Sequence, residues 1–68
     1  MTGKLIVNGE PTIVQLPSTL EAFIRLSGWK PTQIVVEYNE KVIKNSDTSK
    51  IELQEGDRLE IIVPVAGG

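Results

Sequence analysis

Short runs of β-branched and other apolar residues, bounded by turn residues, dominate the chain and are typical of β-strands. Residues 4–7 form the first run, and Asn8-Gly9 follows it directly. This pair favours a two-residue hairpin because both residues tolerate positive φ. The return strand is expected over residues 12–16, with Pro11 at its start, where a missing backbone N–H matters least. The chain is therefore predicted to begin with a β-hairpin.

One helix is predicted, over residues 19–27. Ser18 and Glu21 have the spacing of a capping box, in which the serine oxygen accepts from the third helical N–H and the glutamate reaches back to the cap. Gly28 suits the position after the helix because it adopts the left-handed conformation easily. Three apolar residues recur at helical spacing on one face: Leu20, Phe23 and Ile24.

The second half of the chain is again predicted to form strands, because Pro31 disfavours an immediate second helix. The expected strands cover residues 34–38, 42–43 and 58–63. Turn residues separate them at 39–40 and at 55–57. Residues 44–50 are polar and predict a loop. Residues 64–68 are predicted to be a flexible C-terminal tail.

This order of elements predicts an α+β fold. A hairpin, a helix and three further strands suit a β-grasp, in which a mixed sheet of four to five strands packs one main helix against one face. We expect a single domain over residues 1–63, followed by the tail 64–68. The sheet residues expected to face the helix are Leu5, Val7, Val14, Leu16, Val36, Tyr38, Ile43, Leu59, Ile61 and Val63.

Composition excludes several classes of function. The 68 residues include no His and no Cys, which excludes metal sites and nucleophiles built on those side chains. The net charge of −2 disfavours nucleic-acid binding. The longest apolar runs, such as residues 61–63, are far shorter than the roughly 20 residues that span a bilayer. With no apolar signal region near the N-terminus, we expect a cytoplasmic protein with no membrane partner. The scattered carboxylates predict a solvated surface, so we expect no catalytic residue and no metal site.

The sequence ends in Gly67-Gly68. One interpretation is an arbitrary chain end. The other is that the terminal carboxylate is the reactive group, activated when a partner enzyme converts it to an acyl-adenylate. Such a tail must pass through a narrow channel, and only residues without a Cβ let the backbone lie close to the walls. Pro64, Val65 and Ala66 would then set the direction and reach of the tail.

Several short stretches together resemble the ThiS family, the sulfur carriers of thiamine biosynthesis, which have a ubiquitin-like β-grasp fold. The matching stretches are Val-Asn-Gly-Glu at 7–10, Thr-Leu at 19–20, Val-Glu-Tyr-Asn at 36–39, Val-Ile at 42–43, residues 55–61 and Val-Ala-Gly-Gly at 65–68. Other positions depart from the family pattern. Ser27 replaces a usual Leu, and Asn45 and Thr48 replace an Arg and a Trp. We expect Trp29 to restore part of the lost apolar area.

The resemblance implies a carrier and co-substrate rather than an enzyme. An E1-like adenylating enzyme would use Mg-ATP to activate Gly68, and a persulfide from a sulfur donor such as a cysteine desulfurase would convert it to a thiocarboxylate. That sulfur would pass to thiazole synthase. The carrier itself would bind no cofactor, because ATP and Mg are used by the adenylating partner.

Other interpretations remain open. The small subunit of molybdopterin synthase has the same fold and the same Gly-Gly chemistry, but tends to be longer. Carriers for other sulfur-transfer pathways and protein-modifying ubiquitin relatives are further alternatives. A non-catalytic β-grasp binding module represents a different class.

Strand alternation also predicts a partner surface. If the residues named above face the helix, their neighbours Ile6, Ile13, Val35 and Ile62 face away from it. With the strands in the order second, first, last and third, these side chains would cross four adjacent strands. An exposed apolar stripe of this kind marks a docking surface. The alternative is that Val and Ile are present there only because they favour strands.

Overall fold

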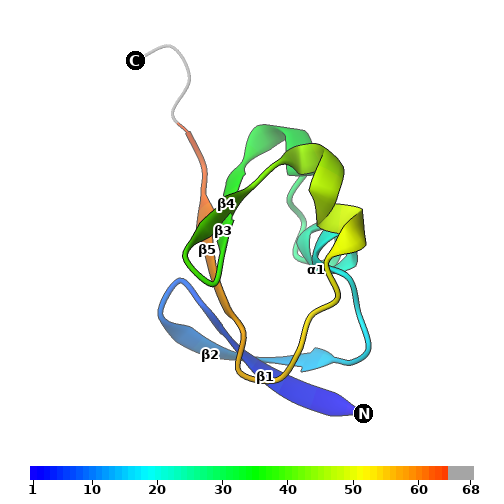
Figure 1. Cartoon of the computed structure of the whole chain (residues 1–68). Coiled ribbons are helices and arrows are strands. Elements are labelled where there is room, and N and C mark those ends of the chain that lie inside the picture. The colour runs from blue at the N-terminus through cyan, green and yellow to red at the C-terminus, as the bar shows by residue number, and fades with distance from the viewer. Residues whose placement is uncertain (65–68) are drawn as a thin grey trace.

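In the part of the chain that the structure describes, the fold is a five-stranded mixed sheet with one α-helix against it (Figure 1). The computed structural model describes residues 1–64. The strands are β1 (Thr2–Val7), β2 (Glu10–Gln15), β3 (Val35–Tyr38), β4 (Lys41–Ile43) and β5 (Arg58–Ile62). The α-helix is α1 (Leu20–Leu26), and two short 3-10 helices are η1 (Pro31–Gln33) and η2 (Asn45–Lys50).

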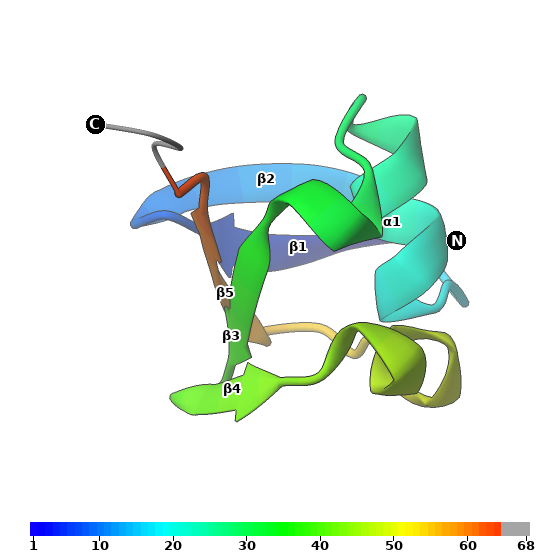
Figure 2. The same cartoon turned by 90° about the horizontal axis from the view of Figure 1, so that it is seen from above.

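The sheet has the strand order β2-β1-β5-β3-β4. The neighbouring strands β1 and β5 run parallel, whereas the pairs β1–β2, β3–β5 and β3–β4 are antiparallel. Figure 2 shows α1 and η2 on the same side of this sheet. The predicted β-grasp and its strand order are therefore confirmed.

The β1–β2 hairpin turns at Asn8 and Gly9, as predicted. Their φ angles of 51° and 81° are those that a two-residue turn between twisted strands requires. Both strands are longer than predicted, because the pairing continues from Val7 opposite Glu10 to Thr2 opposite Gln15. This register fixes which side chains share a face, since a shift of one residue would turn every side chain over.

The helix begins one residue later than the predicted capping box implies. Thr19 is the N-cap, and its Oγ1 accepts a hydrogen bond of 3.1 Å from the Ala22 N–H. Ser18 pairs instead with a distant part of the chain, because its carbonyl accepts a hydrogen bond from the Leu53 N–H at 2.8 Å. The prediction of Ser18 as cap was wrong because this long-range pairing keeps residue 18 outside the helix.

The helix ends as predicted, in a Schellman motif. Gly28 has φ +89° and donates its N–H to the Arg25 carbonyl at 3.1 Å, while Trp29 donates to the Ile24 carbonyl at 3.1 Å. These two bonds pair the carbonyls that the last turn leaves without helical partners. They also fix the backbone of Trp29 directly after the helix.

The segment predicted to be a polar loop, 44–50, contains η2 instead. Thr48 is its buried residue, and the Thr48 hydroxyl donates to the Asn45 carbonyl at 3.0 Å. The chain then pairs with the start of α1, where the Leu20 N–H donates to the Ile51 carbonyl at 2.9 Å. Leu53, which was not predicted to face the helix, becomes part of the core at 3% exposure.

The core lies between the sheet and α1. Its buried members are Leu5, Leu20, Phe23, Ile24, Val36, Leu53 and Leu59. The partly buried residues packed against them are Val7, Val14, Leu16, Ile34, Tyr38, Ile43, Ile51 and Ile61. Among the predicted core positions, Val63 is the exception, with 48% of its surface exposed. Strand β5 ends at Ile62, so Val63 extends beyond the sheet instead of packing beneath the helix.

Asp57 joins the turn before β5 to strand β3. Its Oδ2 accepts hydrogen bonds of 2.8 Å from the Tyr38 hydroxyl and 2.8 Å from the Gln54 N–H. Its Oδ1 accepts from the Asn39 side chain at 3.3 Å. Burial, followed by the hydrogen bond and the negative charge of Asp57, raises the pKa of the Tyr38 hydroxyl above its ordinary value.

We expect Asp57→Ala to destabilise the fold by about 1–3 kcal/mol, because the partly buried Tyr38 hydroxyl loses its acceptor. Urea unfolding would measure this free energy, with Glu52→Ala on an exposed position as the control. The double variant Asp57→Ala with Tyr38→Phe should lose less than the sum of the two single variants. Additive losses would contradict a direct interaction between the two side chains.

Candidate functional site

The point where the tail leaves the sheet is the best-defined part of the predicted site. Strand β5 ends at Ile62, and Val63 and Pro64 continue past it, both exposed. Figures 1 and 2 show the segment that follows β5 on the side of the molecule away from the N-terminus. The predicted reactive residue, Gly68, and the predicted threading residues Val65, Ala66 and Gly67 lie outside the described residues. Their roles and the flexibility of the tail stay predictions.

The four residues of the predicted partner surface differ in exposure. Ile13, Ile62 and Val35 expose 67%, 44% and 37% of their surfaces, whereas Ile6 is half-buried. Ile62 and Val35 lie directly opposite each other on β5 and β3. Ile6 lies opposite Pro11 on β2, so Ile13 is its diagonal neighbour.

Charged residues interrupt this apolar stripe. On β5 the residue beside Ile6 is Arg58, and Glu60 separates Arg58 from Ile62. Glu60 in turn faces Glu37 on β3. The four aliphatic residues therefore form two patches with a charged strip between them, because the parallel register of β1 and β5 offsets Ile62 from Ile6.

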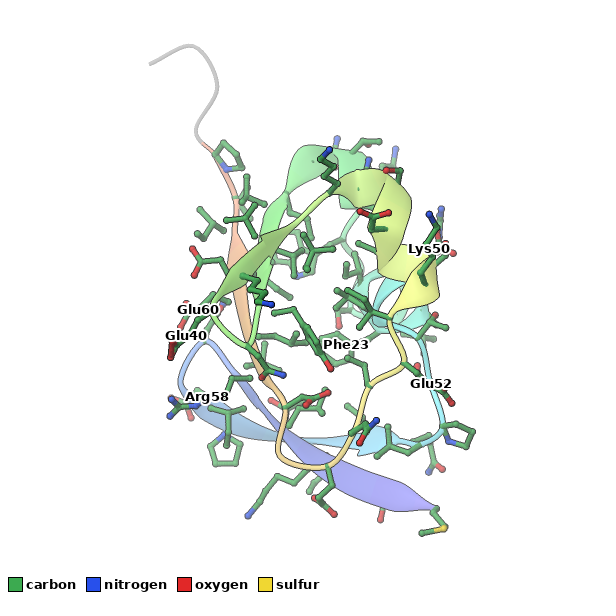
Figure 3. The ribbon with its side chains drawn as sticks, in the orientation of Figure 1. Phe23, Glu40, Lys50, Glu52, Arg58 and Glu60 are labelled. Carbon is green, nitrogen blue, oxygen red and sulfur yellow. The ribbon has the colours of Figure 1, made fainter. Side chains whose placement is uncertain are left out.

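A shallow hollow on the outer face of the sheet spans this charged strip. Its lining residues are Ile6, Gly9, Glu37, Glu40, Arg58, Leu59, Glu60 and Ile62. Figure 3 shows Glu40, Arg58 and Glu60 on this side, while Phe23 points into the interior. Within residues 1–64, no group of three or more carboxylates is arranged to hold a metal ion.

A second hollow, which the sequence analysis did not predict, lies at the start of the tail. It is lined by Trp29, Thr32, Gln33, Ile34, Val35, Val63 and Pro64. These residues come from the segment after α1, from η1, from the start of β3 with the residue before it, and from the segment after β5. The sequence offered one signal for it: the chain's single Trp stands between a helix-ending Gly28 and Pro31, where 41% of its surface is exposed.

Within residues 1–64, no helix has both the length and the apolar character needed to cross a membrane.

Comparison with known proteins identifies the family. The model of the ThiS family matches residues 3–68, which include the Gly67-Gly68 end. The chain belongs to the ThiS family. The predicted family is thereby confirmed, and it comprises the small sulfur carriers of thiamine biosynthesis.

Two curated relatives, both thiazole synthases, contain a segment similar to this chain. The chain is 32% identical over 65 residues to a thiazole synthase of Magnetococcus marinus, a match that covers 96% of this chain and 20% of that protein. It is 31% identical over 65 residues to a thiazole synthase of Paramagnetospirillum magneticum, with the same coverage. This chain thus spans about a fifth of the length of the curated relatives it matches.

A solved structure confirms the fold. The thiamine biosynthesis protein ThiS from Geobacter metallireducens superimposes with a TM-score of 0.79 at 24% identity, over 96% of this chain and 99% of that protein. At this identity the likeness establishes the β-grasp architecture.

Proposed function

We propose that this protein carries sulfur for thiazole formation in thiamine biosynthesis as a thiocarboxylate on Gly68. The observation that carries the proposal is the ThiS family match over residues 3–68, which includes the Gly67-Gly68 end. The chain leaves the sheet after Ile62, where β5 ends. The proposal takes Gly68 as the carboxy-terminal residue of the acting form.

The chemistry runs in three steps. A Gly68 carboxylate oxygen attacks the α-phosphorus of ATP in the adenylating enzyme, pyrophosphate leaves, and an acyl-adenylate forms. A persulfide sulfur on the donor attacks the acyl carbon, AMP leaves, and an acyl disulfide forms. A second thiol then reduces this disulfide, releasing the thiocarboxylate on Gly68 and leaving a disulfide between the two thiols.

In this scheme the protein is a co-substrate, and its partners supply the catalysis. The adenylating enzyme binds ATP and Mg, and a cysteine desulfurase is the proposed source of the persulfide. The receiving enzyme is thiazole synthase, a choice supported by the two relatives of that name. We place the pathway in the cytoplasm, where ATP is available.

Intact-mass spectrometry tests the proposal. The protein is incubated with Mg-ATP, the cognate adenylating enzyme and a persulfide donor with a thiol. We expect a mass increase equal to the difference between sulfur and oxygen, located on the C-terminal peptide. If this increase is absent although the same adenylating enzyme and persulfide donor convert an established sulfur carrier, the proposed function is wrong.

The outer face of the sheet gives a second prediction. We expect Ile6→Lys and Ile62→Lys to raise the KM for the carrier about tenfold or more with the adenylating enzyme or thiazole synthase, because a lysine would have to be desolvated in the interface. Steady-state kinetics with each enzyme would measure the effect.

Val42→Lys is the matched control for this surface. Val42 is an exposed aliphatic residue at 67%, and its pairing with Glu37 places it on the same face of the sheet. The two test variants and the control should melt near the unsubstituted protein. Unchanged KM values with both enzymes would show that Ile6 and Ile62 favour the strands but have no docking role.

A further inference from the structure

The hollow at the start of the tail has the composition of a docking site. We call this hollow, with the lining residues given above, the tail-root groove; its apolar members are Trp29, Ile34, Val35, Val63 and Pro64, and its polar members are Thr32 and Gln33. None of these side chains carries a charge. Trp29, Val35 and Val63 expose 41%, 37% and 48% of their surfaces. The groove is therefore largely apolar and open to solvent, unlike the charged hollow on the outer face of the sheet.

The backbone holds Trp29 in place before any partner arrives. Its N–H donates to the Ile24 carbonyl at 3.1 Å, and Ile24 is fully buried. Two residues later Pro31 begins η1, and the fixed φ of proline limits movement on that side. A tryptophan whose backbone is held in this way loses little backbone freedom on binding, and tryptophan is enriched among the residues that dominate interface energies.

The length of the tail decides where a partner must sit. Gly68 is four residues beyond Pro64 in the sequence, so even a fully extended chain carries it roughly 13–14 Å from Pro64. An enzyme that holds Gly68 at a recessed reaction centre must bring the entrance of its active site close to Pro64. The surface around Pro64, which is the tail-root groove, then lies against that entrance.

We propose that the tail-root groove docks thiazole synthase, with Trp29 packed against an apolar rim at the entrance of its active site. This inference rests on the proposed function. Thiazole synthase is the chosen occupant because two proteins of that name contain a segment similar to this chain. The matched segment is about a fifth of each of those proteins, so in them a carrier-like segment and the rest of the enzyme belong to one chain.

The single tryptophan provides a direct probe. Trp29 is the only Trp among the 68 residues, so carrier labelled with 5-fluorotryptophan gives one fluorine resonance from the groove. We expect this resonance to shift or broaden saturably when unlabelled cognate thiazole synthase is added, because the side chain becomes buried. The dissociation constant is measured in parallel by calorimetry, with both the carboxylate and the thiocarboxylate form of the carrier.

Two variants test the groove, and one tests specificity. Trp29→Ala removes the anchor, and Thr32→Arg places a bulky charge at an exposed position of the groove. Each should weaken binding to thiazole synthase at least about tenfold. Leu26→Ala is the control: Leu26 is another large apolar residue, 87% exposed, close in sequence but outside the groove, and its removal should leave the affinity unchanged. Melting curves of all three variants establish that they are folded.

The outcomes separate this inference from the proposed function. In one outcome the thiocarboxylate forms, but thiazole synthase does not change the fluorine resonance and both variants bind it as tightly as the unsubstituted carrier. This result overturns the groove as a dock and leaves the proposed function intact. Groove-dependent binding to thiazole synthase without thiocarboxylate formation supports the groove as a dock and overturns the proposed function. Weakened binding to the adenylating enzyme alone assigns the groove to that enzyme and overturns the choice of partner. A resonance that broadens with carrier concentration alone identifies a second copy as the occupant and also overturns it.

Discussion

Replacing Gly68 with Ala should abolish adenylation while the protein remains folded. In the proposed function, the carboxylate of Gly68 has to reach the α-phosphate of ATP inside the adenylating enzyme. A channel that fits a backbone without side chains has no room for a Cβ at its narrow end, and Gly is the residue that lets the chain approach closely. The described core, residues 5–61, includes none of the tail, so the stability of the fold should be unaffected.

Adding one residue after Gly68 should have the same effect, because it moves the carboxylate away from the α-phosphate. ATP–pyrophosphate exchange measures adenylation, and a thermal melt measures the fold. Ala66→Gly is the matched control, because it removes a Cβ from the same tail and should preserve exchange. Full exchange activity in Gly68→Ala or in the extended chain would show that the identity and position of the last residue do not matter.

Local chemistry made the hairpin and the end of the helix predictable. Asn8 and Gly9 adopt positive φ, which few other residue pairs do without strain. Gly28 closes α1 with the hydrogen bonds that its position implied. Signals of this kind depend on a few neighbouring residues, so they can be read along the sequence. The same locality explains why the alternation of the strands predicted most of the core.

Long-range pairing explains the errors. The chain near Ser18 pairs with the chain near Leu53, and this contact moved the helix cap to Thr19. It also brought η2 against α1 and buried Thr48. The segment around Thr48 has the composition of a polar loop, but its burial depends on contact with α1, which is distant in sequence, and no local pattern encodes that contact.

The candidate site also has features that local sequence predicts and features that depend on long-range pairing. The role proposed for the Gly-Gly end could be inferred from the sequence, because it depends on the type of the last residues and on their position after the last strand; it stays a prediction. The apolar stripe was predicted from alternation, but its interruption by Arg58 and Glu60 follows from the parallel register of β1 and β5, which alternation does not specify. The tail-root groove combines residues from the segment after α1, from η1, from the start of β3 and from the segment after β5, so only the folded chain brings them together.

Phe23→Ala should leave the protein largely unfolded at room temperature. Phe23 is 9% exposed and packs in the core with Leu20, Ile24 and Leu53 among others. Removing a buried aromatic side chain usually costs about 3–5 kcal/mol, and a domain of this size has a total stability of similar magnitude. The helix itself adds no independent stability, because a seven-residue helix is too short to form without packing against the sheet.

Thermal and urea unfolding followed by circular dichroism would measure the loss. Leu26→Ala is the matched control, since it truncates a large apolar side chain in the same helix at a position that is 87% exposed, and its melting temperature should be close to that of the unsubstituted protein. The comparison isolates burial, because the helix propensity of the introduced residue is the same at both positions. If Phe23→Ala melted within a few degrees of Leu26→Ala, the packing of α1 against the sheet would contribute far less than its burial implies.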